Sequence, residues 1–400
     1  MGQYAFAAGW GVVVDRIGPW ACSLSASVLF LFSYGTFAYL LANSESLSVS
    51  YRTLAVLFFI AGCGRVASYF SAIFSSRTRG CGLATSVPLA LSGLSPLFLS
   101  YVASLGLFQL EDGKTLDTPK FIGWMGVGCG IVHIIGVVGL RHVNEAVEFQ
   151  PEVDDERTAL LGDEARAGEE DRLLKKQTEA IRAGCVVVHR IEPDESLVAL
   201  LKDVSFWIYI AVGVVITGTA EMVIANMGSI VMEFPGGLES AATQVRLMSI
   251  AGTIARLCTG PLADWISPPI DEGSIRMVFP MAFLAMLASG YMWTALYVSS
   301  AAGLWVLSIG TGLGYGGSWA VLPSITSAIW GERNLGRNFG ILSYAPLVGT
   351  PIFTYLYAWS TEDGHPKNMD WRTNFGVCAA ATVVAMGGCV ALWRRWDGRL

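Results

Sequence analysis

Two segments, GVVVDRIG at residues 11–18 and RLCTGPLADWI at residues 256–266, contain the same spacing, Gly-x-x-x-Asp. Both follow apolar stretches of the chain, at the point where charged residues begin. In a membrane helix, a glycine lets a neighbouring helix approach closely. A carboxylate at the helix end can interact with a cation or with the amino terminus of another helix. The repeated spacing predicts a helical protein with two related halves.

Charge is distributed very unevenly along the 400 residues. The chain is 53% hydrophobic and only 14% charged, whereas an average soluble domain is about 25% charged. Residues 141–203 alone contain 16 of the 32 acidic and 9 of the 26 basic side chains. The net charge of −6 therefore belongs to this one segment, and the remainder is apolar enough to lie in a membrane. The sequence has no Lys/Arg stripe that would favour nucleic-acid binding.

Uncharged stretches of about 20 residues can each cross a bilayer as a helix. Ten crossings are expected, three of them with an interior charge, and residues 2–14 form a shorter, partial eleventh. Residues 277–331 are uncharged but too long for one crossing, so we expect two helices separated at residues 299–303. The expected spans are 17–44, 53–76, 80–110, 121–140, 204–232, 243–262, two within 277–331, 338–361 and 373–393.

Basic residues in short connections indicate orientation, because they remain on the cytosolic side. Here they fall in alternate connections, which are predicted to be cytosolic: Arg16, Arg77, Arg79, Arg333, Arg337, Arg394, Arg395 and Arg399. The acidic segment lies on the same side. Just after it, Phe206 and Trp207 are expected to anchor the next span at the membrane interface.

The segment GTGLGYGG at residues 310–317 has the glycine content of a phosphate-binding loop, but it lacks the lysine that follows such a loop. It also lies inside an apolar span. We therefore expect these glycines to serve close helix packing.

The paired Gly-x-x-x-Asp segments resemble the cytosolic loop motif of the major facilitator superfamily, which follows the second helix of each six-helix half. Three further segments resemble its fungal nodulin-like and monocarboxylate-transporter-homologue branch: ATSVPLALSGLS (84–95), EMVIANMGS (221–229) and WGERNLGRNFG (330–340). The resemblance implies an all-α polytopic membrane protein, a two-half bundle of about 11 membrane helices with a short first one.

The resemblance also implies a domain organisation. Residues 1–140 form the N-terminal half, with helices equivalent to 2–6, and residues 204–400 form the C-terminal half, with helices 7–12. Residues 141–203 form a cytosolic acidic linker. One full span precedes the second motif, but only residues 2–14 precede the first. The first helix of the family is therefore expected to be absent.

Interior charges are the best candidates for function, because an ionised side chain in hydrocarbon costs about 2.5–3.5 kcal/mol. Arg65 and Glu221 are such residues. The resemblance implies that the fourth and seventh helices line the central cavity, where Arg65 would hold a substrate carboxylate and Glu221 would exchange a proton. Asn226, in the same segment as Glu221, is a further candidate. The alternative is that these residues form static polar contacts between helices.

The repeated motifs are interpreted as a gate. Arg256, Gly260 and Asp264 lie at i, i+4 and i+8 on one helix face near the cytosolic end. The resemblance implies that such charged junctions hold one conformation closed and break during alternating access. The predicted gating residues are Gly11, Asp15, Arg16, Gly18, Arg256, Gly260 and Asp264.

The acidic linker contains a candidate sorting motif. Glu156, Leu160 and Leu161 match the acidic dileucine form that sorting adaptors bind. This favours the vacuolar membrane, with the plasma membrane as the alternative location. An accidental match in a Glu- and Leu-rich stretch explains the pattern equally well.

The sequence predicts a secondary active transporter that moves a small organic solute by alternating access. A monocarboxylate and coupled protons are the case that the branch suggests. The alternative is a non-transporting membrane receptor or scaffold, or an inactive truncated transporter. No enzyme activity, catalytic residue, metal site or cofactor is expected, since no nucleotide-binding loop, metal-ligand cluster or nucleophile pattern occurs.

Overall fold

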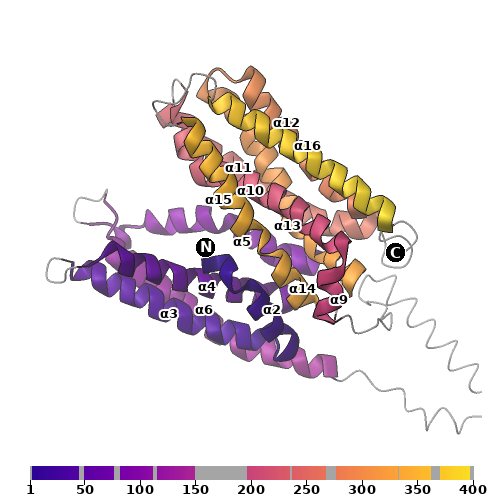
Figure 1. The fold of residues 1–400 in the computed structure, drawn as a ribbon. Helices are drawn as coiled ribbons and strands as arrows, with labels where there is room; N and C mark the ends of the chain where they lie inside the picture. The colour runs from indigo at the N-terminus through magenta and orange to yellow at the C-terminus, as the bar shows by residue number, and fades with distance from the viewer. Residues whose placement is uncertain are drawn as a thin grey trace, which may run out of the picture.

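A computed structural model describes residues 2–44, 49–75, 82–110, 115–148, 196–234, 237–266, 276–331, 333–361 and 370–396. In these ranges the regular structure is helical, apart from one isolated antiparallel pairing of Gln109 with Leu116. The helices form two bundles that lie against each other, one from each part of the chain (Figure 1). The all-α, two-half architecture expected from the sequence is confirmed.

The N-terminal bundle begins with two short helices that together take the place of one span. Longer helices follow, each joined to the next by a short connection. The elements are α1 (Gly2–Ala5), α2 (Ala7–Arg16), α3 (Pro19–Ala42), α4 (Tyr51–Ser75), α5 (Gly82–Ala103), η2 (Gly106–Phe108) and α6 (Thr118–Glu148).

The C-terminal bundle begins after residue 195. Its elements are α9 (Leu197–Lys202), α10 (Val204–Met232), α11 (Gly237–Ile266), α12 (Val278–Tyr297), η4 (Ala301–Leu304), α13 (Trp305–Trp330), α14 (Leu335–Leu342), α15 (Ala345–Thr361) and α16 (Trp371–Trp396). The uncharged stretch 277–331 divides into α12 and α13 at the expected place. The last expected pair of spans is also present, but the first of them is broken between α14 and α15.

Seven described spans are long and apolar enough to cross a membrane: α3, α4, α6, α10, α12, the α14–α15 segment and α16. Three further long helices, α5, α11 and α13, have 22, 30 and 26 residues. All three carry buried polar side chains, such as Ser86, Gln244 and Ser318. They also pack closely on other helices: α11 lies between α5 and α13. Their polar side chains therefore belong to the interior of the bundle.

Contacts between the two bundles run along two helix pairs. Helix α5 packs on α11, and α2 packs on α14. Inside the bundles, α3 packs on α4 and α6, while α10 packs on α15 and α16. Figure 1 shows the indigo N-terminal end of the chain beside the orange α14, although the two segments are far apart in sequence. The interface between bundles is therefore built from pairs of one helix from each half.

Glycines allow the closest of these helix contacts. A Cβ atom at Gly312 would lie 2.4 Å from the carbonyl oxygen of Met248, and one at Gly316 would lie 2.5 Å from that of Gly252. The packing role expected for residues 310–317 is thus confirmed. At the turn between α2 and α3, Gly18 adopts a φ of 108°, which side-chain-bearing residues rarely adopt. Pro19 then starts α3 with its fixed φ.

One expectation about the membrane interface is wrong. Phe206 is fully buried and packs edge-on against Trp330, with ring centroids 5.1 Å apart. Only Trp207 is exposed, and its indole nitrogen donates to the carbonyl of Leu201. Phe206 is buried because α9 turns the chain back onto the end of the bundle, where Leu200 is also buried.

Candidate functional site

The Glu221 carboxylate lies at the centre of a hydrogen-bond network that joins the two bundles. The Tyr315 hydroxyl on α13 donates to Oε1 at 2.8 Å, and the Thr350 hydroxyl on α15 donates to Oε2 at 2.6 Å. The Tyr4 hydroxyl on α1 also donates to Oε1. Three helices other than its own therefore hold Glu221, and one of them belongs to the opposite half.

All three partners of Glu221 are hydroxyl donors. An ionised carboxylate can accept every one of these bonds, whereas a protonated carboxyl group is itself a donor and must find an acceptor. The network therefore suits the charged form, and after protonation one of the three hydroxyls has to reverse and accept, or turn away. A change of charge at this side chain is thereby coupled to contacts between helices.

Arg65 on α4 lies near the same centre. Its side chain is exposed, and its guanidinium is within electrostatic range of Tyr4, Tyr34 and Tyr69. No carboxylate among the described residues pairs with it. Arg65 stands 10 residues before the end of α4 at Ser75, which places it about 15 Å inside that end. The structure therefore holds a cation without an ion-pair partner near mid-membrane.

Arg256 on α11 likewise stands 10 residues before the last described residue of its helix, Ile266. Its guanidinium lies directly against Gly93 of α5, in the space that a larger side chain would fill. It is within electrostatic range of Tyr69 and Tyr315. The sequence grouped Arg256 with the gate, and the structure places its guanidinium against α5 of the other half.

Tyr69 completes the donor side of this centre. Its hydroxyl is buried and has no hydrogen-bond partner among the described residues. Arg65 and Arg256 both lie within electrostatic range of this hydroxyl. We call Arg65, Tyr69 and Arg256 the donor cluster. A buried hydroxyl without a partner costs about 1–3 kcal/mol, so the donor cluster is suited to a bound acceptor.

The bundles are held together at one end by Asp15 of the first motif. Its Oδ1 accepts from the backbone N–H of Gly336 at 3.0 Å, and its Oδ2 accepts from that of Arg337 at 2.8 Å. These N–H groups belong to the first turn of α14, where a carboxylate is favoured by the helix dipole. Gly11 brings the two helices together, since a Cβ there would collide with the Gly336 carbonyl.

An aromatic layer that includes Tyr69 of the donor cluster lies between α4, α13 and α14. Tyr69 and Phe70 on α4 face Trp319 on α13 and Phe339 on α14. The ring centroids of the Tyr69–Trp319 and Phe70–Phe339 pairs are each 6.2 Å apart, and those of Trp319 and Phe339 are 6.1 Å apart. These contacts join the two halves. The centre is therefore closed toward the Asp15 end, which the sequence predicts to be cytosolic.

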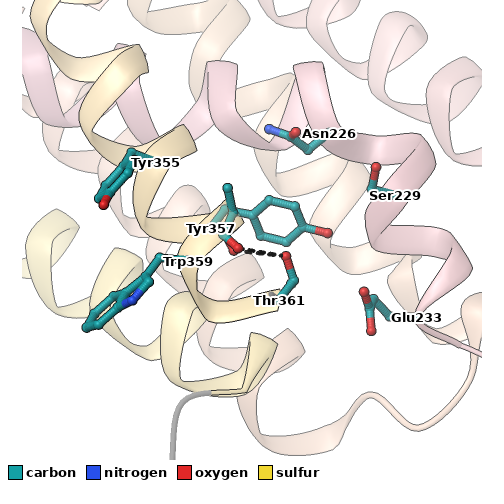
Figure 2. Close-up of a pocket in the computed structure, with 8 residues that line it drawn as sticks. Asn226, Ser229, Glu233, Tyr355, Tyr357, Trp359 and Thr361 are labelled. Carbon is teal, nitrogen blue, oxygen red and sulfur yellow. Dashed lines mark hydrogen bonds between the residues drawn. The ribbon is translucent and has the colours of Figure 1, made fainter. Parts of the chain in front are cut away.

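Asn226 does not join the Glu221 network. It lines a separate pocket near the opposite ends of α10 and α15, together with Ser229, Glu233 and Tyr357 (Figure 2). The pocket volume is about 510 Å³. Its location at the end away from Asp15 places it on the predicted outer side.

Other predicted gating residues occupy less informative places. Arg16 is exposed at the end of α2, and Gly260 is buried within α11. The side chain of Asp264 lies outside the described part of the structure, as do Glu156, Leu160 and Leu161 of the candidate sorting motif. The sequence did not indicate a role for Tyr4, Tyr69 or Gly93, or for the backbone N–H groups that bind Asp15. Tyrosines, glycines and backbone amides carry no distinctive sequence signal.

A two-half helical bundle around a polar centre is the architecture of a membrane transporter. The family model described as Major Facilitator Superfamily matches residues 1–345. The chain belongs to this family, and it is an integral membrane protein. The resemblance noted in the sequence is thereby confirmed.

Relatives and solved structures agree with this assignment. The chain is 27% identical over 427 residues to a "Probable transporter MCH1" of Candida glabrata, covering 99% of this chain and 84% of the relative. The proton:xylose symporter XylE has a similar fold, with a TM-score of 0.62, 13% identity and coverage of 96% and 82%. The E. coli fucose:proton symporter FucP has a TM-score of 0.57 and 10% identity, and the match covers 98% of this chain and 88% of FucP. The relatives are transporters and not enzymes, as the sequence predicted.

Proposed function

We propose that this transporter is a secondary carrier of a small organic anion, with a monocarboxylate as the simplest case, and that Glu221 couples its movement to protons. The observation that carries the proposal is the donor cluster. Arg65 and Arg256 contribute two positive charges, and Tyr69 contributes a hydroxyl without a hydrogen-bond partner among the described residues. The Glu221 carboxylate is already occupied by three other donors. An anion supplies the missing acceptor.

The two arginines come from opposite halves, Arg65 from α4 and Arg256 from α11. A guanidinium binds a carboxylate through two parallel hydrogen bonds, so an anion between them would be held by both bundles. Binding would then offset the cost of two unpaired charges, which is about 2.5–3.5 kcal/mol each in hydrocarbon. This also assigns Arg256 to the substrate in place of the gate.

Proton coupling is supported by the Glu221 network. Protonation removes the negative charge and adds a donor, so at least one of the bonds from Tyr4, Tyr315 and Thr350 has to change. The Tyr4 bond is the one that crosses between halves. Glu221 can therefore link a proton to the relative position of the bundles.

Alternating access requires the closed end to open. In this structure the contacts to be broken are the two hydrogen bonds of Asp15 to α14 and the aromatic layer between α4, α13 and α14. Gly11, Gly18 and Arg16 belong to the helix end and turn that carry Asp15. We propose that this group is the cytosolic gate.

The test is uptake into liposomes that contain the purified protein. Small mono- and dicarboxylates are compared with neutral solutes, with and without an inward proton gradient. Uptake of an anion that is stimulated by the gradient supports the proposal. Gradient-independent uptake of neutral solutes alone, or no uptake of any solute by folded protein, contradicts it and favours the receptor or scaffold alternative.

Arg256→Gln has a matched control on its own helix, Arg246→Gln. Arg246 is exposed near the other end of α11. We expect Arg256→Gln and Arg65→Ala to lower uptake at least tenfold and Arg246→Gln to leave it near the wild-type rate. Glu221→Gln should remove the stimulation by protons. Equal uptake by all four variants would assign the anion to another site.

We further propose the vacuolar membrane as the location, with sorting adaptors as partners through Glu156, Leu160 and Leu161. The support is the predicted cytosolic position of this acidic dileucine motif in the linker. Tagged protein should move to the plasma membrane when Leu160 and Leu161 are both replaced by alanine. An unchanged distribution would count against the motif.

A further inference from the structure

The pocket between α10 and α15 has a chemical character opposite to that of the donor cluster. It lies where both helices end, at Met232 and Thr361. Figure 2 shows Asn226, Ser229 and Glu233 on α10 and at its end, facing Tyr357 of α15. The carbonyl ends of two helices carry partial negative charge, so the position alone favours a cation.

Tyr357 provides the evidence that this pocket is built for a ligand. Its side chain is only 4% exposed, yet its hydroxyl has no hydrogen-bond partner among the described residues. The ring points from α15 toward α10, with the hydroxyl on the side of Ser229 and Glu233 (Figure 2). The Glu233 carboxylate is within electrostatic range of this hydroxyl. A polar group that is buried and unpaired is destabilising until a ligand or water pairs with it.

The pocket offers acceptors at the Glu233 carboxylate and the Asn226 oxygen, beside the Ser229 hydroxyl and the Trp359 indole. The Asn226 amide nitrogen donates one of its two N–H groups to the Met222 carbonyl at 2.8 Å, and its oxygen remains available as an acceptor. Glu233 contributes an exposed carboxylate. The Thr361 hydroxyl hydrogen is also used, since it bonds the Tyr357 carbonyl at 3.2 Å. No lysine or arginine is among the described residues that line the pocket.

We propose that this pocket is an accessory binding site for a protonated amine. An ammonium group offers three N–H donors and one positive charge, which matches the Glu233 carboxylate, the Asn226 oxygen and the Tyr357 hydroxyl acting as an acceptor. The volume of about 510 Å³ is in the range of small-molecule sites. This site is separate from the donor cluster and does not depend on the proposed anion transport.

The test measures binding of three probes of equal length to the purified full chain in lipid nanodiscs. n-Butylammonium carries the positive charge, butyrate carries a negative charge, and 1-butanol is neutral. Calorimetry gives the affinity for each. We expect butylammonium to bind at the pocket and butyrate at the donor cluster, while butanol reports apolar partitioning only.

Variants assign each probe to its site. Glu233→Gln should weaken butylammonium binding about tenfold or more, because a charge-assisted hydrogen bond is lost, and should leave butyrate unchanged. Arg256→Gln should do the reverse. Tyr357→Phe should weaken butylammonium binding without lowering the melting temperature, because the removed hydroxyl has no partner. Tyr39→Phe is its matched control, since Tyr39 is 62% exposed on α3 and does not line the pocket.

The results separate this inference from the proposed function. Loss of butylammonium binding in Glu233→Gln and Tyr357→Phe, but not in Tyr39→Phe, supports the amine site. Equal binding of butylammonium and butanol, or binding that both pocket variants retain, overturns it. A failure of butyrate to bind contradicts only the anion proposal. Because Glu233 is exposed, its variant remains informative even if Tyr357→Phe does not fold.

Discussion

Tyr4 and Glu221 belong to opposite halves of the protein, and the hydroxyl of the first donates a hydrogen bond to the carboxylate of the second. The same carboxylate oxygen accepts from Tyr315, which lies in Glu221's own half. The Glu221 carboxylate therefore accepts two kinds of hydrogen bond. The bond from Tyr4 crosses between the halves and changes when they move, whereas the bond from Tyr315 lies within one half and need not change. This pairing provides a direct way to measure what the inter-half contact contributes.

Replacing Tyr4 by phenylalanine should shift the protein toward the state that is open at the Asp15 end. The change removes one hydrogen bond between halves, worth about 0.5–1.5 kcal/mol, so the population should shift roughly two- to tenfold. Distances between spin labels on α2 and α14 would measure the shift. Tyr315→Phe is the control, because it removes a bond within one half and should change these distances much less. Equal effects of the two variants would show that the Tyr4 bond has no special role.

Asp15→Asn should open the same end through a different contact. The amide retains one acceptor oxygen but loses the charge that favours the amino terminus of α14, a loss of about 1–2 kcal/mol. The α2–α14 label distance is again the measurement. Asp370→Asn is a matched control, since Asp370 accepts from Thr373 N–H at the start of α16 within one half. It should lower thermal stability without changing the inter-half distance.

Gly93→Ala should act on the anion site without a direct contact to the solute. The new methyl group occupies the place of the Arg256 guanidinium, and this flexible side chain can move away, so the protein should still fold. We expect butyrate affinity to fall about as far as in Arg256→Gln, roughly tenfold. Gly128→Ala on α6 is the control, because a Cβ there meets no neighbouring atom. Unchanged affinity in Gly93→Ala would remove Arg256 from the proposed site.

Gly312→Ala should destabilise the C-terminal half. Its methyl group would collide with the backbone carbonyl of Met248, which cannot move as a side chain can. A cost of about 1–3 kcal/mol is expected from such overpacking, and thermal unfolding in detergent would detect it. Gly387→Ala on α16 should leave the melting temperature unchanged or slightly higher, because a Cβ there meets no neighbour and alanine favours helix. A similar fall in both variants would indicate a general intolerance of substitution.

Much of the fold was predictable because membrane insertion depends on local composition. The expected span 204–232 coincides with α10, and residues 277–331 divide where the small residues stand. Phe206 shows the limit of this reasoning. An aromatic residue at a span end is typical of the interface, but packing against Trp330 buries it.

The candidate site was predictable only in its charged members. Arg65 and Glu221 were identified because a charge in an apolar stretch is costly wherever the chain goes. Arg256 was identified as a gating residue, and its contact with Gly93 could not be predicted, since helical spacing indicates which residues share a face and not which helix that face meets. Tyr4 and Tyr69 were not identified, because a tyrosine in a membrane helix is common.

The sequence by itself determined that this chain is a two-half membrane protein, because hydropathy, glycine and charge act over a single helix. Only the tertiary structure decided that Asp15 meets the backbone N–H groups of α14 and that Tyr4 reaches Glu221. These partners are distant in sequence, and one of them is a backbone group that every residue possesses. Their pairing arises from the close approach of helices from different halves, which no local pattern encodes.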